Sequence, residues 1–255
     1  MAERPGTGGR TGGPADVSAP VSAVPAVSAV SASSSAEESK SQRTRAAIVD
    51  AALRLFRERG YQGTTMREVA AGAGVSTGNA YYYFRSKEEL VQGFYDHMAE
   101  EHAAAVRPVL VATADFGERL HGVLATWLRI AEPYHEFAGR FFAVAAQPDN
   151  PLSPFSPESS AARQTAVDVY AAVLRGADVR PDPKLAEHLP ELLWLYHLGI
   201  VLYWVHDTSP GQARTQDLIV RTVPMVDRLV RLSRMRILRP LTTQVIDLLA
   251  ALRGP

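Results

Sequence analysis

The amino-acid sequence predicts an all-α protein, and three observations support this prediction. Apolar residues such as Ile48, Ala52 and Leu55 recur at helical spacing, with charged side chains on the other faces. A Ser or Thr followed three residues later by Glu, which forms a helix-capping box, occurs at Thr65 and at Ser86. No strand pattern appears between residues 41 and 90, and no alternation of strand and helix patterns follows them.

The composition excludes several functional classes. The chain of 255 residues carries 27 cationic and 27 anionic side chains, so it is not a generic polycation that coats nucleic acid or membrane. Because there is no cysteine, a disulfide framework, a thiolate zinc site and a cysteine nucleophile are excluded. No apolar stretch reaches the roughly 18 residues of a membrane span. We therefore expect no membrane partner and a cytoplasmic protein.

The chain begins with a low-complexity tail, which precedes the predicted helices. Residues 1–40 are rich in small side chains and lack an export signal, so we expect them to be disordered. An amphipathic helix is expected over Arg43–Arg59, where Gly60 ends it. Thr65 opens a second helix to Ala71, Ser76 opens a third to Tyr83, and Ser86 opens a fourth at Lys87.

The second and third of these helices have the dimensions of a helix-turn-helix, which reads DNA, although an ordinary helical hairpin has the same outline. Two features favour DNA. Between Ser41 and Leu90 there are eight cations and five anions in an otherwise neutral chain. The third helix also carries groups that suit phosphates and base edges, and three adjacent tyrosines cannot all face one core. These groups are Ser76, Thr77, Asn79, Tyr81, Tyr82 and Tyr83.

The run TTMREVAAGAGVSTGNAYYYFRSKEEL, from Thr64 to Leu90, closely resembles the N-terminal domain of TetR-family transcriptional regulators. The resemblance covers about Gln42 to Met98. It implies a homodimer, a three-helix DNA-binding domain at residues 41–90, and a larger all-α domain at 91–255 that binds a small molecule and dimerises. No cofactor and no catalytic residue are implied.

The resemblance also implies roles for individual residues. Thr65 would bind a phosphate from the second helix, and Arg67 would bind a phosphate or a base. The reading helix would begin with Thr77, Gly78 and Asn79, and Asn79 would reach a base edge. Tyr81, Tyr83 and Lys87 would bind phosphates, whereas Tyr82 would touch a thymine methyl group. Family members usually have a larger aliphatic residue in place of Ala80, so Tyr82 has a second interpretation, in which it packs over Ala80.

Other motifs carry less weight. Gly74–Gly78 fits the G-x-S-x-G pattern of hydrolases, but the strand that must precede the serine is missing. The seven histidines contain no H-E-x-x-H motif and no pair at four-residue spacing, so we expect no metal site. The basic run from Arg228 to Arg239 is expected to solvate a helix end.

The remaining sequence predicts further helices, the last at about 241–252. The stretch 187–206 is apolar nearly all round and needs cover on several sides, so we expect it to form a dimer interface together with the stretch 212–232. Aromatic residues among the helices of the C-terminal domain are the candidates for lining a mostly apolar effector pocket. The four selected are Trp127, Phe141, Trp194 and His197.

These observations lead to one functional prediction and one alternative. The prediction is a ligand-responsive regulator, a repressor by family default, that a small molecule releases from a palindromic operator in double-stranded DNA. The alternative is a helical protein that binds or modifies small molecules and uses its N-terminal unit only for packing. The sequence does not identify the effector, the operator, the regulated genes or the role of residues 1–40.

Overall fold

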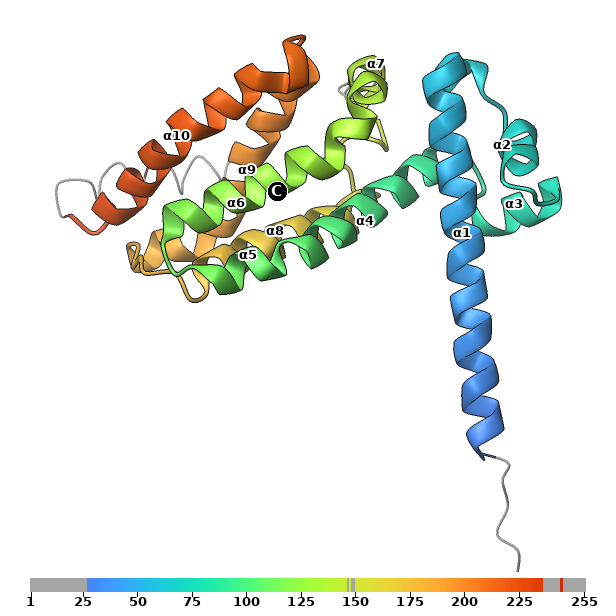
Figure 1. Cartoon of the computed structure of the whole chain (residues 1–255), viewed down its shortest axis with the longest axis horizontal. Helices are drawn as coiled ribbons and strands as arrows, with labels where there is room; N and C mark the ends of the chain where they lie inside the picture. Colours follow the sequence, from blue (N-terminus) through green and yellow to red (C-terminus); the bar gives the residue numbers. More distant parts are fainter. Residues whose placement is uncertain (1–26, 146, 148–149, 236–243, 245–255) are drawn as a thin grey trace, which may run out of the picture. The chain divides into compact units, whose positions relative to one another are not determined.

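The computed structural model describes residues 27–145, 147, 150–235 and 244 (Figure 1). The chain divides into two units, with the boundary between residues 43 and 44. Helices without any strand make up the described part of the chain, which confirms the predicted fold class. No helix in the described residues is long and apolar enough to cross a membrane.

The first helix begins earlier than the sequence predicts. Helix α1 spans Val27–Gly63, so residues 27–40, expected to be disordered, are helical. This stretch contains neither Pro nor Gly and is rich in Ala, Ser and Glu. Extending an existing helix costs less free energy than starting one, so these residues continue the helix that the apolar stretch after Arg43 begins. The rest of the predicted tail, residues 1–26, lies outside the described residues.

Two short helices follow α1, where the sequence predicts them. The backbone of Gly60 leaves the helical region at φ 77°, which breaks α1 before its last three residues. Helix α2 spans Met66–Gly72 and α3 spans Thr77–Tyr83, and Gly74 between them has φ 70°. A positive φ is easy only for glycine, so Gly74 permits the tight turn.

The larger part of the chain is built from longer helices. After α4 (Lys87–Ala105), the predicted break at Pro108 takes the form of a separate short helix, because Pro108 fits the first turn of α5. Apart from residue 244, which is helical, the predicted helix at 241–252 lies outside the described residues, as does the end of the basic run. The other elements are α5 (Arg107–Ala112), α6 (Phe116–Ala131), η1 (Glu132–Tyr134), α7 (His135–Ala145), α8 (Ser160–Leu174), α9 (Pro183–Val205), η2 (Pro210–Gln212) and α10 (Ala213–Leu232).

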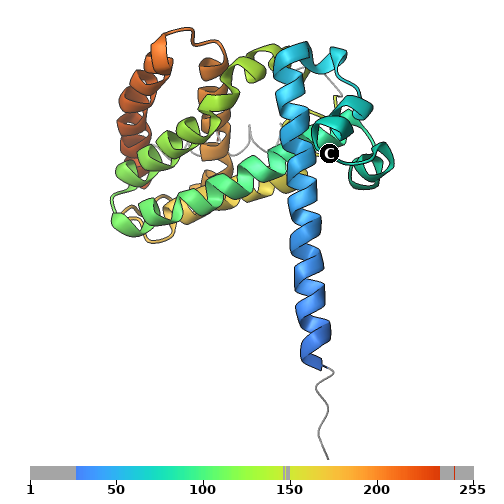
Figure 2. The ribbon, with the colours of Figure 1, turned by 45° about the vertical axis from the view of Figure 1, so that its right-hand side comes forward.

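The buried apolar side chains of residues 44–255 form two clusters. One cluster joins α1, α2 and α3 to the first turns of α4 and to α7. The other lies among α6, α8, α9 and α10, and Figure 2 shows α9 and α10 side by side. Helix α4 contributes to the first cluster and packs along α8. The predicted domain boundary after residue 90 therefore falls inside a helix that serves both parts.

A buried arginine holds the end of the bundle where α5, α6 and α8 meet. Only 4% of Arg119 is exposed, and its guanidinium donates hydrogen bonds to five carbonyl oxygens. Burial lowers the pKa of Arg119. Because the last carbonyl groups of a helix have no partner within the helix, this side chain provides the missing donors. The acceptors are Leu110, Thr113, Ala172, Val173 and Arg175.

Candidate functional site

The start of α2 is fixed by a capping box, as the sequence predicts. The Thr65 hydroxyl accepts a hydrogen bond from Glu68 N at 3.3 Å, and Thr65 N donates to Glu68 Oε2 at 2.9 Å. Arg59 Nη1 lies 2.6 Å from Glu68 Oε1. The hydrogen bonds from Thr65, and next the charge of Arg59, lower the pKa of Glu68. A phosphate at Thr65 would therefore meet a hydroxyl that already belongs to the cap.

The two helices of the turn pack closely through small residues. Val69, Ala70 and Ala80 are at most 1% exposed, and Val75 N donates to Ala70 O at 3.0 Å across the turn. The hydroxyl of Ser76 accepts a hydrogen bond from Asn79 N at 3.1 Å, which caps α3. Ser76 is thus a helix cap, and a helix, not a strand, precedes it.

One face of α3 is open to solvent. Thr77, Gly78 and Asn79 are exposed, as are 49% of Tyr81 and 81% of Tyr82. Tyr83 is half-buried, and its ring centroid lies 5.2 Å from that of Tyr82 with the rings nearly perpendicular. A helix that presents aromatic and polar groups in this way suits a DNA groove.

The structure excludes one of the two interpretations of Tyr82. Ala80 is fully buried while Tyr82 is 81% exposed, so Tyr82 does not pack over Ala80. The small side chain of Ala80 instead lets α3 approach its neighbours closely. The Tyr82 ring is left on the same exposed surface as Asn79.

Lys87 has a structural role that the sequence does not reveal. Its ammonium group donates to Tyr61 O at 2.9 Å and lies 4.7 Å from the centroid of the Tyr61 ring. The Tyr61 hydroxyl donates to Glu88 Oε1 at 2.5 Å, and burial together with Glu88 raises the pKa of Tyr61. Lys87 therefore joins α1 to α4, and a phosphate contact would have to compete with these interactions.

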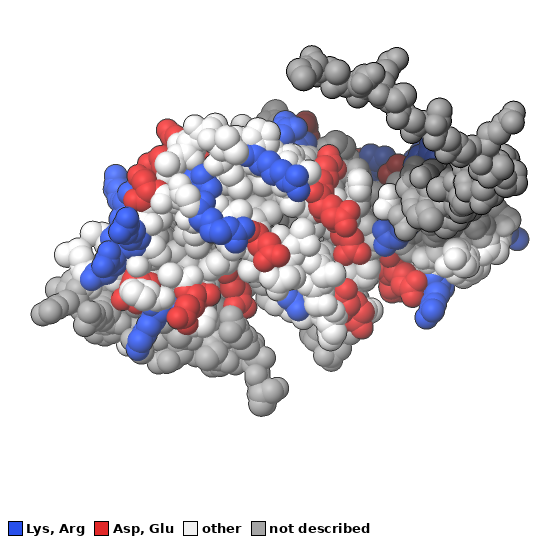
Figure 3. All heavy atoms as spheres, turned by 90° about the horizontal axis from the view of Figure 1, so that it is seen from below, with Lys and Arg blue, Asp and Glu red and all other residues white. Residues whose placement is uncertain are grey.

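Most of the predicted basic surface also stabilises the fold. At least five of the eight cations between residues 41 and 90 contact other groups of this chain, whereas Arg67 and Arg85 are exposed at α2 and just after α3. Basic and acidic side chains are interspersed over the face shown in Figure 3. The contacts are Arg45 with Asp96 and the Phe84 ring, Arg54 with Gly72 O, Arg57 with Pro133 O, Arg59 with Glu68, and Lys87 with Tyr61.

The four predicted pocket residues do not lie together. Trp127 and His197 are neighbours, with ring centroids 4.8 Å apart. Phe141 lies in the core cluster that Trp127 also contacts, but its ring packs toward α1, with its centroid 5.8 Å from that of Tyr61. Trp194 is 5% exposed, and its ring centroid lies 5.5 Å from that of Phe155. Among the four residues, only Trp127 and His197 are in ring contact, so the predicted pocket is reduced to this pair.

Two further polar residues that the sequence did not single out surround His197. Tyr170 of α8 is fully buried with its ring centroid 5.9 Å from that of His197, and the His102 ring lies at 6.1 Å. His102 Nε2 is 3.0 Å from Val123 O. Burial, and next the nearby His102, lowers the pKa of His197 to about 3, so His197 is neutral. A tyrosine in an apolar helical pattern resembles ordinary core, so no sequence signal marked Tyr170.

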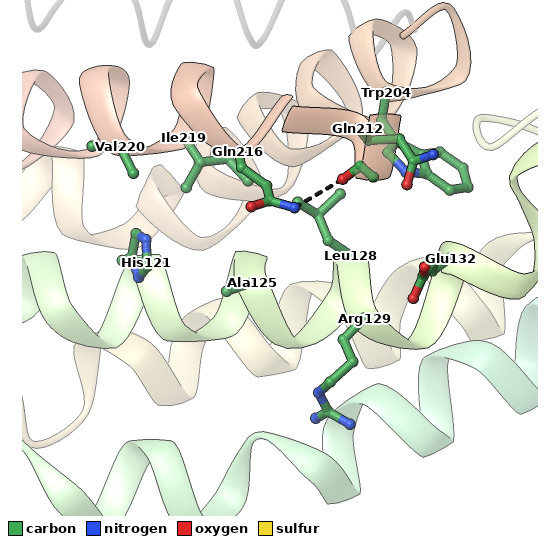
Figure 4. Close-up of a pocket in the computed structure, with 11 residues that line it drawn as sticks. His121, Ala125, Leu128, Arg129, Glu132, Trp204, Gln212, Gln216, Ile219 and Val220 are labelled. Carbon is green, nitrogen blue, oxygen red and sulfur yellow. Dashed lines mark hydrogen bonds between the residues drawn. The ribbon is translucent and has the colours of Figure 1, made fainter. Parts of the chain in front are cut away.

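A groove of about 450 Å³ lies between α6 and α10 (Figure 4). Its walls include Ala125 and Leu128 of α6, and Gln216 and Val220 of α10. Trp204 of α9 lines one end, near Gln212. Gln216 Nε2 donates to Gly211 O at 2.9 Å, which holds the groove wall against the turn that precedes α10.

The described residues include no cluster of three or more His, Asp or Glu side chains that could hold a metal ion. A capped helix-turn-helix with an exposed reading helix, joined to a helical body with a groove, defines the class of protein: a DNA-binding regulator with a separate regulatory domain.

Comparison with known proteins identifies the family. Residues 48–93 match the model of bacterial regulatory proteins of the tetR family, and residues 119–251, just over half of the chain, match the tetracyclin repressor-like C-terminal domain. The chain belongs to the TetR family. It is therefore a ligand-responsive transcriptional repressor that binds operator DNA as a dimer.

Individual relatives agree with this result. The transcriptional repressor KstR2 of Mycobacterium tuberculosis is 31% identical over 146 residues, which cover 54% of this chain and 70% of KstR2. The structure of Thermus thermophilus FadR in complex with lauroyl-CoA is similar with a TM-score of 0.51 and 25% identity, covering 71% of this chain and 93% of FadR. A TetR regulator from Nitrosomonas europaea shares the fold at a TM-score of 0.55 and 19% identity, and the match covers 71% of this chain and 96% of that regulator.

Proposed function

We propose that this repressor reads a palindromic operator with the exposed face of α3, and that a small molecule bound among α4, α6, α8 and α9 releases it. The observation that carries the DNA-reading role is the exposure of Asn79, Tyr81 and Tyr82 on one short, capped helix. Acting on bacterial DNA, the protein would work in the cytoplasm, and the proposal assigns it no catalytic step.

The proposed contacts divide into two kinds. Asn79 and Tyr82 would touch base edges, because hydrogen bonds and apolar contacts to base edges carry sequence information. Thr65, Arg67, Thr77, Tyr81 and Tyr83 would hold the phosphates, and the backbone at Gly78 would allow the duplex to approach. Lys87 would support this surface from beneath, through Tyr61, and take a phosphate only in second place.

The dimer would form through α9 and α10, which lie side by side. These helices expose an apolar surface: Leu202, Tyr203, Met225, Leu229 and Leu232 are each between 43% and 60% exposed. Large apolar side chains that gather in this way mark an interface. A two-fold axis through this surface would present two copies of α3, which is what a palindromic operator requires.

The proposed link between effector and DNA passes through α7. Phe137 of α7 stacks on Phe56 of α1 with ring centroids 5.9 Å apart, and Phe141 contacts Tyr61. At the first residue of α7, His135 contacts Trp204 of α9. Helix α7 thus touches both the helix that supports α2 and α3 and the helix that carries His197. A shift of α7 would change the spacing of the two reading helices in the dimer.

The binding test is a selection of fragments from sheared genomic DNA at about 0.15 M salt, where non-specific binding is weak. The wild type is compared with Tyr81→Ala and with the control Val111→Ala, whose side chain is 87% exposed on α5. We expect a palindrome to be enriched by the wild type and the control and lost in Tyr81→Ala. An unchanged palindrome in Tyr81→Ala would contradict the role of α3, and no enrichment by any protein would contradict operator binding.

The effector test follows once the operator is known. Lauroyl-CoA is the first compound to examine, because the Thermus relative was crystallised with it. Release of the operator fragment, measured by fluorescence anisotropy, would identify an acyl thioester as an effector. Coupling free energies in allosteric proteins correspond to about 5- to 150-fold changes in affinity, which this assay resolves.

A further inference from the structure

The hydroxyl of Tyr170 is buried without a hydrogen-bond partner among the residues that the structure describes. Tyr170 is fully buried in α8, and its Oη contacts no donor or acceptor among the described residues. A buried polar group without a partner destabilises a fold by about 1 to 3 kcal/mol. Phenylalanine would satisfy a position that only needs packing, so this hydroxyl indicates a partner beyond the described residues.

A second such group lies beside it on the next helix. His197 of α9 is 6% exposed, and within the described part of the protein its Nε2 also has no partner. The two rings are in edge contact at 5.9 Å. His102, the third polar ring of this cluster, differs because Val123 O lies within hydrogen-bond distance of its Nε2. Two unsatisfied polar groups on adjacent helices therefore occupy the same part of the core.

Trp127 connects this pair to the groove between α6 and α10. Its ring lies 4.8 Å from that of His197 and 5.2 Å from that of Trp204, which lines the groove. Trp204 is 2% exposed, and its Nε1 is a third buried atom without a partner among the described residues. The unsatisfied groups thus mark a line from the groove inward past Trp127 to Tyr170.

The surroundings limit what can bind. Around the pair the core is aliphatic and aromatic, including Val173, Leu193 and Ile200. An anion buried there would need a counter-charge, but the imidazole is neutral, and the buried guanidinium of Arg119 is occupied by five carbonyl oxygens. A carbonyl oxygen accepts from two donors, and a hydroxyl accepts from one and donates to the other, so either suits a phenol beside an imidazole.

We propose that Tyr170 and His197 form the polar end of the effector site, and that the effector is an apolar molecule whose uncharged carbonyl or hydroxyl oxygen hydrogen-bonds to both. The proposal rests on the proposed function, in which this part of the chain binds the effector. The apolar body of the effector would displace Trp127 and extend toward Trp204 and the groove.

The test uses three matched sets of compounds that differ in the oxygen group. The first is dodecane, dodecanone and dodecanoate; the second is androstane, androstanone and an androstane carboxylate; the third is lauroyl-CoA and dodecyl-CoA, which lacks the carbonyl. Binding to the full chain is measured by calorimetry and tryptophan fluorescence, and operator release by anisotropy. In at least one set, we expect the ketone or thioester to bind and release DNA while the hydrocarbon, carboxylate or thioether does not.

Variants separate a binding role from a structural one. Tyr170→Phe should leave the thermal stability of the free protein unchanged or higher, because it removes an unsatisfied hydroxyl, yet weaken binding of the carbonyl compound about 5- to 30-fold. His197→Phe should also weaken binding of the carbonyl compound. The control Tyr95→Phe removes a hydroxyl that donates to Leu152 O at 3.2 Å, so it should lower stability slightly and leave binding unchanged.

Several outcomes would overturn the proposal: no binding in any set, equal binding of the hydrocarbon or the carboxylate, or unchanged affinity in Tyr170→Phe. A crystal structure of the complex with the oxygen away from Tyr170 Oη would do the same. Operator binding by the free protein, measured on the same samples, tests the proposed function separately. If operator is bound and a carboxylate releases it, the inference fails and the repressor function stands; if operator is not bound, the function itself fails.

Discussion

His135 Nε2 donates a hydrogen bond of 2.7 Å to the carbonyl oxygen of Trp204, and the two rings meet edge to face with centroids 4.7 Å apart. The contact attaches the first residue of α7 to the end of α9. Phe137, two residues later, stacks on Phe56 of α1, so these two contacts form a short path from Trp204 to the helix that supports α2 and α3.

This relationship predicts a variant that binds both partners but couples them weakly. In His135→Ala, α7 loses its attachment to α9, so operator affinity and effector affinity should each stay near the wild-type value. The change in operator affinity caused by lauroyl-CoA, or by the ketone that releases the wild type, should fall severalfold. Anisotropy titrations with and without the compound measure it. His97→Ala, at an exposed position of α4, is the control. Release as strong as in the wild type would show that coupling bypasses this contact.

We expect α3 to read bases and α2 to bind phosphates, so variants of the two helices should have different effects on DNA binding. Asn79→Ala should change base preference at one operator position, at a cost of about 1 to 3 kcal/mol for the preferred base. Arg67→Ala should weaken binding to all sequences and reduce the slope of log K against log salt by about 1 for each phosphate that the variant no longer binds. Salt titrations on operator and scrambled DNA distinguish the two.

The matched control for these variants is Arg180→Ala, an exposed arginine between α8 and α9. It should leave both base preference and salt slope unchanged. Equal losses on operator and scrambled DNA for Asn79→Ala would contradict base reading by α3.

The exposed surface of α10 should decide the oligomeric state. Leu229→Glu places a charge on a side chain that is 59% exposed in one subunit, so the monomer should remain folded while the dimer dissociates. Light scattering after gel filtration should give a monomer that no longer binds operator at nanomolar concentration. Val111→Glu, on the 87% exposed residue of α5, should stay dimeric. A dimeric Leu229→Glu protein would place the interface elsewhere.

The turn between α9 and α10 should make stability sensitive to acid. Asp207 is 4% exposed; burial raises its pKa, but hydrogen bonds from Ser209 and Thr215 outweigh burial and hold the pKa of Asp207 well below its usual range. A carboxylate with a lowered folded-state pKa stabilises the protein above its unfolded pKa, near 3.9, and this contribution is lost as pH falls below it.

Asp207→Asn should therefore lower the melting temperature near pH 7, and the gap to the wild type should narrow below about pH 4. Other acids with lowered pKa values, such as Glu68 and Asp178, contribute to the acid sensitivity of both proteins, so the difference between them is the diagnostic quantity. Thermal unfolding followed by circular dichroism gives this difference. Asp168→Asn, an exposed carboxylate of α8, should show no gap at any pH.

Local features of this fold were predictable from the sequence. At Thr65, Ser76 and Ser86 the hydroxyl accepts a hydrogen bond from the backbone N–H three residues later, and all three caps occur in the structure. The full capping box predicted at Ser86 does not form, because the Glu89 side chain accepts a hydrogen bond from Arg85 N. The break at Gly60 depends on a single backbone angle. These interactions lie within one turn of helix, so spacing along the chain is enough to identify them.

Long-range contacts were not predictable in the same way. Nothing in the spacing of Lys87 indicates that it lies on Tyr61, and nothing separates Phe141, which packs against α1, from an aromatic residue of a pocket. Tyr170 and His197 are 27 positions apart, and only the pairing of α8 with α9 brings them together. For the same reason the basic residues near α3 looked available for DNA, although most are occupied by contacts distant in sequence.

The carbonyl groups gathered around Arg119 have a consequence for where the molecule can change shape. Five hydrogen bonds from one planar group tie the ends of α5 and α8 to the first turn of α6, and lysine could replace at most three of them. That end of the helical body therefore acts as a fixed pivot. An effector that moved α6 relative to α8 would therefore open these helices most at the opposite end, and the length of α6 would amplify the displacement before it reached η1 and α7.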